Sequence, residues 1–299
     1  MKKVVVAILV AVLVLVLITP AVLAKPDMDK PLPATDVELA KKVTLQGKPA
    51  GVGKPVKQAA TGILGEPSSG AKYAVIVGIS DYPGTVNDLQ YCDDDAQDIY
   101  TALTTLYGYS SSNIHLLLDM DASFNATRDA INDIKSKAVV GDEVVFFFSG
   151  HGTKGVADDG DRERTDEAIV SHDGDPSGNF IAIWDGQLED WFTGFDTSRI
   201  IFIFDSCLAG GMTDLQAPGR VINMACSESG LSYEDDSWGN GQFTYYFVDQ
   251  GMLVSKADKY DNIPSVADVT IEEGFDYAKA NCLMQKPTIS DSFNNDLLL

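Results

Sequence analysis

The chain has 299 residues, with 22 Lys and Arg against 44 Asp and Glu, so its formal net charge is −22 at pH 7. Hydrophobic residues make up 45% of the sequence and charged residues 22%, a globular composition that excludes a wholly disordered chain. The acidic balance argues against nucleic acid as a partner and disfavours docking on anionic lipid, because both need a basic surface. Cationic partners, either metal ions or peptides that carry Lys and Arg, remain.

Residues 1–24 have the pattern of a secretory signal peptide. Two lysines precede an unbroken apolar run from Val4 to Ile18, and Ala21-Val22-Leu23-Ala24 fits the small-residue positions of a cleavage site. The alternative is an uncleaved N-terminal anchor, since the apolar run nearly reaches membrane-spanning length. In both cases we expect a secreted protein or one at the extracytoplasmic cell surface, with a membrane as partner only if this segment is not cleaved.

Residues 25–72 have a different composition, rich in Pro and Gly and poor in large apolar side chains. Eight Lys against five acidic residues give this segment a net charge of +3. It cannot bury enough apolar surface to fold alone, so we predict a disordered basic linker or propeptide, in which only Asp36 to Leu45 could form a short helix. The remaining residues, 73–299, have a net charge of −27 and form the folded domain.

Strand and helix patterns alternate through residues 73–299. Predicted strands are continuous apolar runs, and predicted helices have apolar residues at helical spacing. The strands are 73–79, 114–118, 144–148, 200–204 and 221–225, and the helices are 93–107, 127–138, 188–192 and 243–253. This alternation indicates an α/β fold with a mostly parallel central sheet flanked by helices.

Two of the predicted strands end in residues that can carry thiol chemistry. His151 follows the strand at 144–148, and Cys207 follows the strand at 200–204. The carboxyl ends of parallel strands meet at one edge of a sheet, where an imidazole can accept the proton of a thiol. The backbone N–H groups of Gly152 and Cys207 could then form an oxyanion hole. A lone His or Cys is more often structural, but two strand-terminal motifs together favour catalysis.

At these residues the sequence resembles the caspase-like cysteine peptidases of the C14 type, above all the metacaspases and their prokaryotic relatives. The motifs are Phe147-Phe148-Ser149-Gly150-His151-Gly152, Asp205-Ser206-Cys207 followed by Gly210, Cys92-Asp93-Asp94-Asp95-Ala96 and Gly241-Gln242-Phe243-Thr244-Tyr245-Tyr246. The resemblance extends from Tyr73 almost to the C-terminus. It implies a caspase-hemoglobinase fold and peptide-bond hydrolysis by a Cys–His dyad, with Cys207 as the nucleophile and His151 as the general base.

Charge near the two motifs favours a substrate with a basic side chain before the cleaved bond, at the P1 position. The resemblance implies that Asp95, Ser149 and Asp205 line a pocket for Arg or Lys. A pair of carboxylates in a partly desolvated pocket selects a cation and rejects an anion. The alternatives are that Asp95 only complements a helix dipole and that Asp205 only binds loop amides, which leaves open a peptidase that prefers Asn or Asp at P1.

The stretch Asp158–Asp175 holds eight acidic residues and two Arg, a pattern that is usually a solvated loop. The resemblance implies a different use, because metacaspases often need calcium, and Asp166, Asp185 and Asp214 match three of the family's ligand positions. Gly186 stands where the family usually has a further Asp. Calcium takes six to eight oxygen ligands and accepts carbonyls and water, so three carboxylates could suffice. Both the calcium site and the solvated loop remain open.

The four cysteines are Cys92, Cys207, Cys226 and Cys282. Export permits disulfide bonds, but a catalytic Cys207 leaves three cysteines, so at least one of them has no intrachain partner. The sequence does not decide which of the three are paired.

The sequence therefore predicts a secreted or cell-surface cysteine endopeptidase that acts on peptides or proteins with basic residues. We also expect the N-terminal segment to lie across the acidic cleft as a substrate and to be removed by self-cleavage. Among its lysines are Lys41, Lys42, Lys48, Lys54 and Lys57. The alternative from another class is a catalytically silent, calcium-stabilised interaction module of the same fold.

Overall fold

The structure, a computed structural model, describes residues 26–45, 58–160, 163–175, 177–259, 266 and 268–299. The predicted signal peptide at residues 1–24 lies outside these ranges. Within them, no helix combines the length and the apolar character that crossing a bilayer requires.

A six-stranded sheet with the order β13-β10-β9-β5-β3-β4 forms the centre of the molecule. Its strands are β3 (Lys72–Gly78), β4 (Ile114–Leu118), β5 (Glu143–Ser149), β9 (Ile200–Asp205), β10 (Arg220–Met224) and β13 (Thr288–Asp291). All neighbouring pairs are parallel except β10 and β13. The predicted mostly parallel sheet is confirmed, and its five parallel strands are the five that the apolar runs predict.

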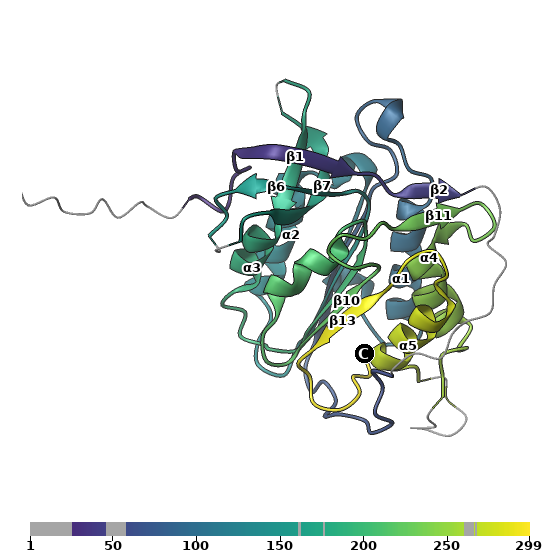
Figure 1. Ribbon diagram of the computed structural model, residues 1–299. Coiled ribbons are helices and arrows are strands. Elements are labelled where there is room, and N and C mark those ends of the chain that lie inside the picture. Colours follow the sequence, from purple (N-terminus) through teal and green to yellow (C-terminus); the bar gives the residue numbers. More distant parts are fainter. Residues whose placement is uncertain (1–25, 46–57, 161–162, 176, 260–265, 267) are drawn as a thin grey trace, which may run out of the picture.

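Helices cover both faces of this sheet and give the molecule three layers (Figure 1). On one face, α2 (Phe124–Lys135) and α3 (Asp185–Phe192) pack against side chains such as Phe146. On the other face, α1 (Cys92–Thr105), the π-helix η5 (Tyr245–Leu253) and α5 (Ile271–Asn281) pack against side chains such as Phe147. Successive residues of a strand point to opposite faces, so each buried strand supplies both cores.

Short helices complete the connections between these elements. They are η1 (Thr85–Asn87), η2 (Ser111–Asn113), η3 (Asp119–Asp121), η4 (Ala209–Leu215) and α4 (Gln242–Thr244). The predicted helix at 127–138 begins earlier, at Phe124, because the Ser123 side chain caps it by accepting a hydrogen bond from the N–H of Ala126 at 3.2 Å.

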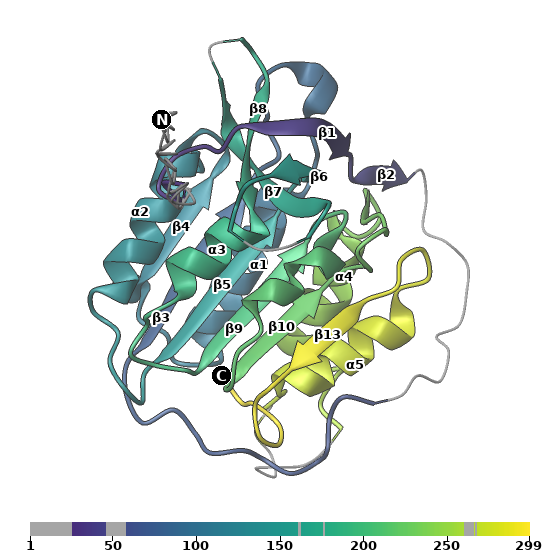
Figure 2. The same ribbon diagram turned by 60° about the vertical axis from the view of Figure 1, so that its left-hand side comes forward.

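Two small sheets lie above the carboxyl ends of the parallel strands (Figure 2). The first has the order β1-β6-β7-β8 and the second the order β12-β11-β2. Their strands are β1 (Ala34–Ala40), β2 (Val43–Leu45), β6 (Gly152–Ala157), β7 (Asp166–Gly174), β8 (Phe180–Trp184), β11 (Tyr233–Asp235) and β12 (Asn240–Gly241). The sequence patterns predicted neither sheet.

The N-terminal segment supplies the outer strand of each small sheet. Strand β1 pairs antiparallel with β6, and β2 pairs parallel with β11. The short helix predicted for residues 36–45 is therefore wrong, and these residues are not a disordered linker. The segment lacks the apolar side chains to fold alone, but the exposed edges of β6 and β11 offer the N–H and C=O groups that its backbone needs.

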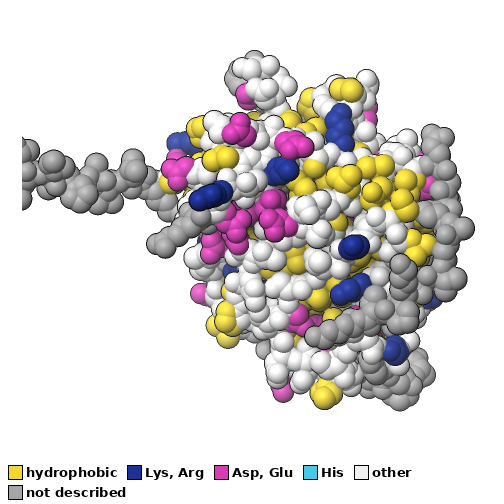
Figure 3. Space-filling view, in the orientation of Figure 1, with side chains coloured by type: hydrophobic (Ala, Val, Ile, Leu, Met, Phe, Trp, Pro, Cys, Tyr) yellow, Lys and Arg dark blue, Asp and Glu magenta, His cyan; other side chains and the backbone are white. Residues whose placement is uncertain are grey.

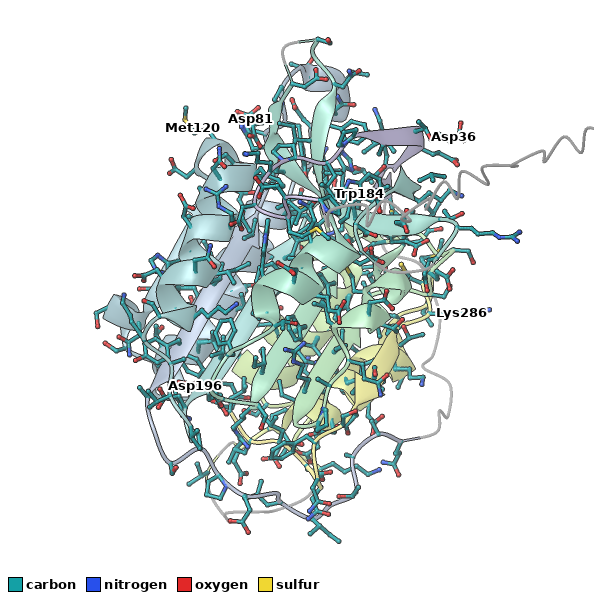
Figure 4. The ribbon with its side chains drawn as sticks, turned by 90° about the vertical axis from the view of Figure 1, so that its left-hand side faces the viewer. Asp36, Asp81, Met120, Trp184, Asp196 and Lys286 are labelled. Carbon is teal, nitrogen blue, oxygen red and sulfur yellow. The ribbon has the colours of Figure 1, made fainter. Side chains whose placement is uncertain are left out.

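A small apolar cluster holds the beginning of this segment. Trp184 is buried together with Ala168 and Ala182, and Leu32 and Ala34 of the segment pack against them. Figure 4 shows Trp184 inside the molecule, whereas Asp36 of β1 lies at its edge. The segment is thus packed against the folded domain as well as hydrogen-bonded to it.

Candidate active site

The structure brings His151 and Cys207 to the same end of the central sheet. Strands β5 and β9 are parallel neighbours, and their last residues, Ser149 and Asp205, stand opposite each other in register. His151 and Cys207 each follow two residues later, and both side chains are almost fully buried. The predicted nucleophile and base therefore emerge from adjacent strand ends, as the sequence reasoning requires.

Hydrogen bonds fix both the tautomer and the position of His151. Its Nε2 lies 2.8 Å from the carbonyl oxygen of Asn87, so Nε2 carries the proton and Nδ1 is the acceptor nitrogen. The backbone N–H of His151 donates to the Tyr82 hydroxyl at 3.0 Å, and the two rings lie 4.7 Å apart. Burial lowers the pKa of His151 to about 4, so the imidazole is neutral at pH 7.

The Cys207 thiol is buried beside two backbone groups. Burial raises its pKa to about 11, although a hydrogen bond from the N–H of Ser232 to Sγ at 3.2 Å acts in the opposite direction. Gly152 lies against the backbone of Cys207, where any larger residue would collide with the Cys207 carbonyl. The two residues predicted to supply the oxyanion hole are therefore neighbours.

Asp95 and Asp205 form one buried acidic pocket, and the side chain of Lys42 fills it. The Lys42 Nζ lies 3.1 Å from Asp205 Oδ1 and 3.4 Å from Asp95 Oδ2, and it donates to Ser149 Oγ at 3.0 Å. The side chains of the lysine and of both aspartates are inaccessible to solvent. The three residues predicted to bind substrate thus surround one ammonium group of the chain itself.

Fixed donors hold the two carboxylates in place. Asp95 accepts from Ser149 Oγ at 2.6 Å and from the N–H of Gly241 at 2.9 Å. Asp205 accepts from Ser232 Oγ at 2.6 Å and from the N–H and Oγ1 of Thr244 at 2.9 and 2.8 Å. Since each carboxylate keeps an oxygen toward the pocket, neither serves only as a helix-dipole partner or a loop ligand.

The pocket has two negative groups for one ammonium. Burial and the neighbouring Asp205 raise the pKa of Asp95 to about 7, against the opposing effect of Lys42. Burial would lower the pKa of Lys42, but the attraction of Asp205 and Asp95 outweighs it, and the pKa stands well above its usual value. Lys42 therefore stays charged, and the pocket has the electrostatics of a cation site.

Two groups that shape the site were missed from the sequence. Tyr82 follows β3, the strand next to β5, so its place after a parallel strand end was a signal that could have been used. Ser232 contacts both Cys207 and Asp205 but lies in a connection without any strand pattern. Only the folded chain brings Ser232 to the thiol.

A second hollow of about 170 Å³ opens beside His151. Its lining is mostly apolar and includes Leu39 of β1, Tyr82, Pro83, Val170 and Phe180. It lies next to the imidazole of His151.

The predicted calcium ligands lie in an acidic cluster around the start of α3. Asp185 is buried there, and burial followed by the nearby Asp159 and Asp214 raises its pKa well above the usual value. Asp166 begins β7, and its Oδ2 accepts from the N–H of Ala157 at 2.7 Å. Figure 3 shows Asp and Glu side chains gathered on the face below β1.

The cluster also contains Glu163 and Glu167, two acidic residues that were not among the predicted calcium ligands. Carboxylate oxygens of Asp185, Glu163 and Glu167 lie within 4.8 Å of one another. Among the described residues, Asp185 Oδ2 and Glu167 Oε2 are buried without a hydrogen-bond partner. Burial raises the pKa of Glu167 to about 8. A donor set made only of oxygens, some of them uncompensated, fits a hard cation such as calcium.

The structure also shows what lies beside Gly186, the position where the family usually has a further Asp. A side chain at Gly186 would come within 2.8 Å of the Asp159 carboxylate. The N–H of Gly186 donates to Asp159 Oδ2 at 3.2 Å. Asp159 thus brings a carboxylate to the place that a side chain at 186 would take.

The four cysteines, all in the described part of the chain, are free and buried. Burial raises the pKa of Cys226 to about 12, and it also raises the values of Cys92 and Cys282. These three thiols are therefore inert side chains of the interior.

Comparisons with known proteins agree with these observations. The caspase domain family matches residues 71–293. Metacaspase-4 of Arabidopsis thaliana is 36% identical over 151 residues, 48% of this chain and 34% of the relative, and metacaspase-1 of Candida glabrata is 27% identical over 219 residues, 65% and 53% of the two chains. The chain thus spans only about a third of the length of the Arabidopsis relative.

A solved structure gives the fold independently. A crystal structure of a Geobacter sulfurreducens protein superposes with a TM-score of 0.53 at 17% identity, over 74% of this chain and 93% of the other. The three-layer architecture, the His and Cys motifs at adjacent strand ends and the family match over most of the chain lead to one assignment. This chain belongs to the caspase domain family, peptidase C14, and within it resembles the metacaspases.

Proposed function

We propose that this protein is a cysteine endopeptidase in which Cys207 and His151 form the catalytic dyad. Nδ1 of His151 takes the thiol proton, and Sγ attacks the carbonyl carbon of the substrate. The developing oxyanion accepts hydrogen bonds from the N–H groups of Gly152 and Cys207. His151 then gives its proton to the leaving amine, and water hydrolyses the thioester to release the acid and restore the thiol.

We further propose that the residue before the cleaved bond is Arg or Lys. The observation that carries this proposal is the ammonium of Lys42 between Asp205 and Asp95. A substrate cation could replace it contact for contact, whereas an acidic side chain would meet two buried carboxylates. An unpaired buried charge is costly enough to give strong discrimination.

A panel of fluorogenic peptides that differ only at P1 tests both statements. With millimolar calcium, we expect the Arg and Lys peptides to be cleaved and the Asn and Asp peptides to resist. Cys207→Ala is the matched control and should be inactive. Cleavage after Asp would contradict the acidic pocket, and an inert protein whose thermal stability still rises with calcium would favour the interaction module.

Calcium binding is a separate part of the proposal. Asp185, Glu163 and Glu167, with Asp159 beside them, would hold the ion, which would supply positive charge to this partly buried acidic cluster. We expect millimolar calcium to raise the melting temperature of the wild type but not of Asp185→Asn. Magnesium is the control, since its smaller octahedral shell suits this set of carboxylates less well. Equal calcium shifts in both proteins would contradict the site.

Self-processing and export complete the proposal. The lysines of the N-terminal segment are the first basic residues that the active site can meet, so we propose that it cuts this segment in the secreted or cell-surface protein. Mass spectrometry of the wild type and Cys207→Ala after calcium addition should reveal a shortened N-terminus in the wild type alone. Identical N-termini would exclude self-cleavage.

A further inference from the structure

The direction in which Lys42 enters the acidic pocket decides what its segment can do. Cleavage after Lys42 would release the nitrogen of Val43, and His151 would have to protonate it. The N–H of Val43 instead donates to the carbonyl oxygen of Ser232 at 2.9 Å, within the pairing of β2 with β11. The leaving nitrogen is thus engaged by the strand and not by the catalytic base.

The N–H that faces the catalytic nitrogen belongs to the wrong residue. The N–H of Lys42 itself donates to Nδ1 of His151 at 3.4 Å. This arrangement would suit cleavage of the bond between Lys41 and Lys42, but the side chain in the pocket would then have to be that of Lys41. The Nζ of Lys41 donates to the carbonyl oxygen of Val86 at 2.8 Å, in an exposed position. Neither bond of Lys42 is placed for hydrolysis.

The strand pairing leads to the same conclusion. A substrate with its P1 side chain in this pocket must direct its carbonyl toward Cys207 and its following nitrogen toward His151. If its preceding residues pair with the edge of β11 that β2 occupies, they run antiparallel to β11, toward the pocket. The segment does the opposite, because Val43 to Leu45 follow Lys42 along β11 in the parallel direction. It occupies the pocket with reversed polarity.

We infer that Ala34–Leu45 is an inhibitor built into the chain, bound in the direction opposite to a substrate and resistant to cleavage at Lys42. This inference rests on the proposed peptidase function. Any self-cleavage then uses another lysine. The segment closes the cleft on both sides of the dyad, since Ala40 is paired with Gly152 and Lys42 contacts His151.

Residues that precede the inhibitor in the chain are also held against the domain, by hydrogen bonds. The Gln187 side chain donates to the carbonyls of Met28 and Lys30 at 2.9 and 3.0 Å, and Trp191 Nε1 donates to that of Met28 at 3.1 Å. A segment of the same chain acts at an effective concentration on the order of millimolar. A substrate must therefore displace a competitor that is always present.

Two substitutions within the segment test the inference. Lys42→Ser removes the ammonium from the pocket. Val43→Pro keeps Lys42 but removes the backbone N–H that donates to the carbonyl oxygen of Ser232. We expect each to raise the initial rate on an Arg peptide substrate about tenfold or more, because the open state becomes populated. Lys30→Ser, which removes an exposed ammonium of the N-terminal segment that is paired with Asp27, is the matched control and should act as the wild type. If Lys42→Ser folds poorly with its two uncompensated carboxylates, Val43→Pro still gives the answer.

The cleavage products of the wild type test the polarity itself. After incubation with calcium, mass spectrometry should find no fragment that begins at Val43. Such a fragment in the wild type and not in Cys207→Ala would overturn the reversed arrangement. Unchanged rates in both Lys42→Ser and Val43→Pro would overturn the inhibition.

Alkylation separates this inference from the proposed function. Iodoacetamide should modify Cys207 about tenfold faster or more in Lys42→Ser and Val43→Pro than in the wild type, whether or not any peptide is hydrolysed. Faster alkylation without hydrolysis in any variant would uphold the inhibitor and reject the peptidase. Hydrolysis of Arg peptides with equal alkylation and equal rates in all variants would do the reverse.

Discussion

The Cys207 thiol is the residue whose chemistry depends most on what covers it. Burial raises its pKa to about 11 while the N-terminal segment is in place. Only the thiolate is nucleophilic, so at pH 7 the closed protein holds its nucleophile almost wholly in the unreactive form. The three other cysteines have raised pKa values too, which leaves Cys207 as the thiol that responds first to alkaline pH.

This state predicts a distinctive pH profile for alkylation of the wild type. The rate with iodoacetamide should rise about tenfold per pH unit from pH 7 and level off only near pH 11, because the thiolate fraction follows the raised pKa. Peptide mapping of the alkylated cysteine gives the measurement, and Cys207→Ala should lack the modified peptide. A plateau near pH 8 would mean that burial does not control this thiol.

Tyr82 is a positioning residue for the base. Its hydroxyl accepts from the N–H of His151 and donates to the carbonyl oxygen of Val170 at 3.2 Å. In a Lys42→Ser background, Tyr82→Phe should lower kcat about tenfold with little change in KM, since a buried N–H loses its partner while the pocket is untouched. The pH at which the acidic limb of kcat/KM falls should also move, because the environment of the imidazole changes.

The matched control for Tyr82→Phe is Tyr91→Phe. The Tyr91 hydroxyl bonds to exposed Asp236 at 2.9 Å, away from the dyad. The control should keep both kcat and the pH profile of its parent. An equal loss in the two variants would assign the effect of Tyr82 to general stability.

Among the secondary-structure elements, the central sheet could be predicted from the sequence because its signal is local. Strand β5, for example, contains Val144 to Phe148, and a run of such side chains can be satisfied only between two layers of helices. The strand ends then follow, and with them the meeting of His151 and Cys207. This part of the site needed only the order of the elements and the rule for parallel sheets.

The two N-terminal strands of the small sheets, β1 and β2, could not be predicted in this way. β1 has mostly exposed side chains, and β2 is three residues long, so neither shows an apolar period. Their conformation comes from the edges of β6 and β11, far away in the sequence. The opposite charges of the two parts did predict contact between the N-terminal segment and the acidic cleft. The direction in which the segment runs there depends on strand pairing, which composition does not encode.

Helix α5 carries a buried acid that makes stability depend on pH. Glu272 accepts from the N–H of Leu297 at 2.7 Å, and burial raises its pKa to about 8, with Asp291 and Asp296 adding to the shift. The folded state therefore holds this proton more tightly than the unfolded chain, whose Glu has a pKa of about 4.5. The stabilisation is complete below about pH 4.5 and is lost as the pH rises to about 8.

Glu272→Gln should remove this loss, because Gln resembles the protonated acid and cannot ionise. We expect equal melting temperatures for variant and wild type at pH 4.5, and a variant that melts several degrees higher at pH 9. Differential scanning calorimetry at the two pH values gives the measurement. A variant that is less stable at both would show that Glu272 is needed as a carboxylate.

On the scale of the whole molecule, the charge is divided between two parts that attract each other. The domain at residues 73–299 has a net charge of −27, and the preceding 48 residues have a net charge of +3. Lys42 of that basic segment lies between the two carboxylates of the pocket. The same field that holds the inhibitor would also attract a basic substrate once the cleft is open.

This shared field predicts how salt affects the opened enzyme. In Lys42→Ser, kcat/KM for a peptide with Arg at P1 and two further Lys should fall about tenfold between 10 mM and 300 mM salt, because the Debye length shrinks from about 30 Å to below 8 Å and weakens long-range steering. A peptide with one Arg and neutral neighbours should lose much less, since its contacts lie inside the desolvated pocket. If the two peptides respond equally, the domain charge plays no part in substrate capture, and only the pair of Asp95 and Asp205 selects the cation.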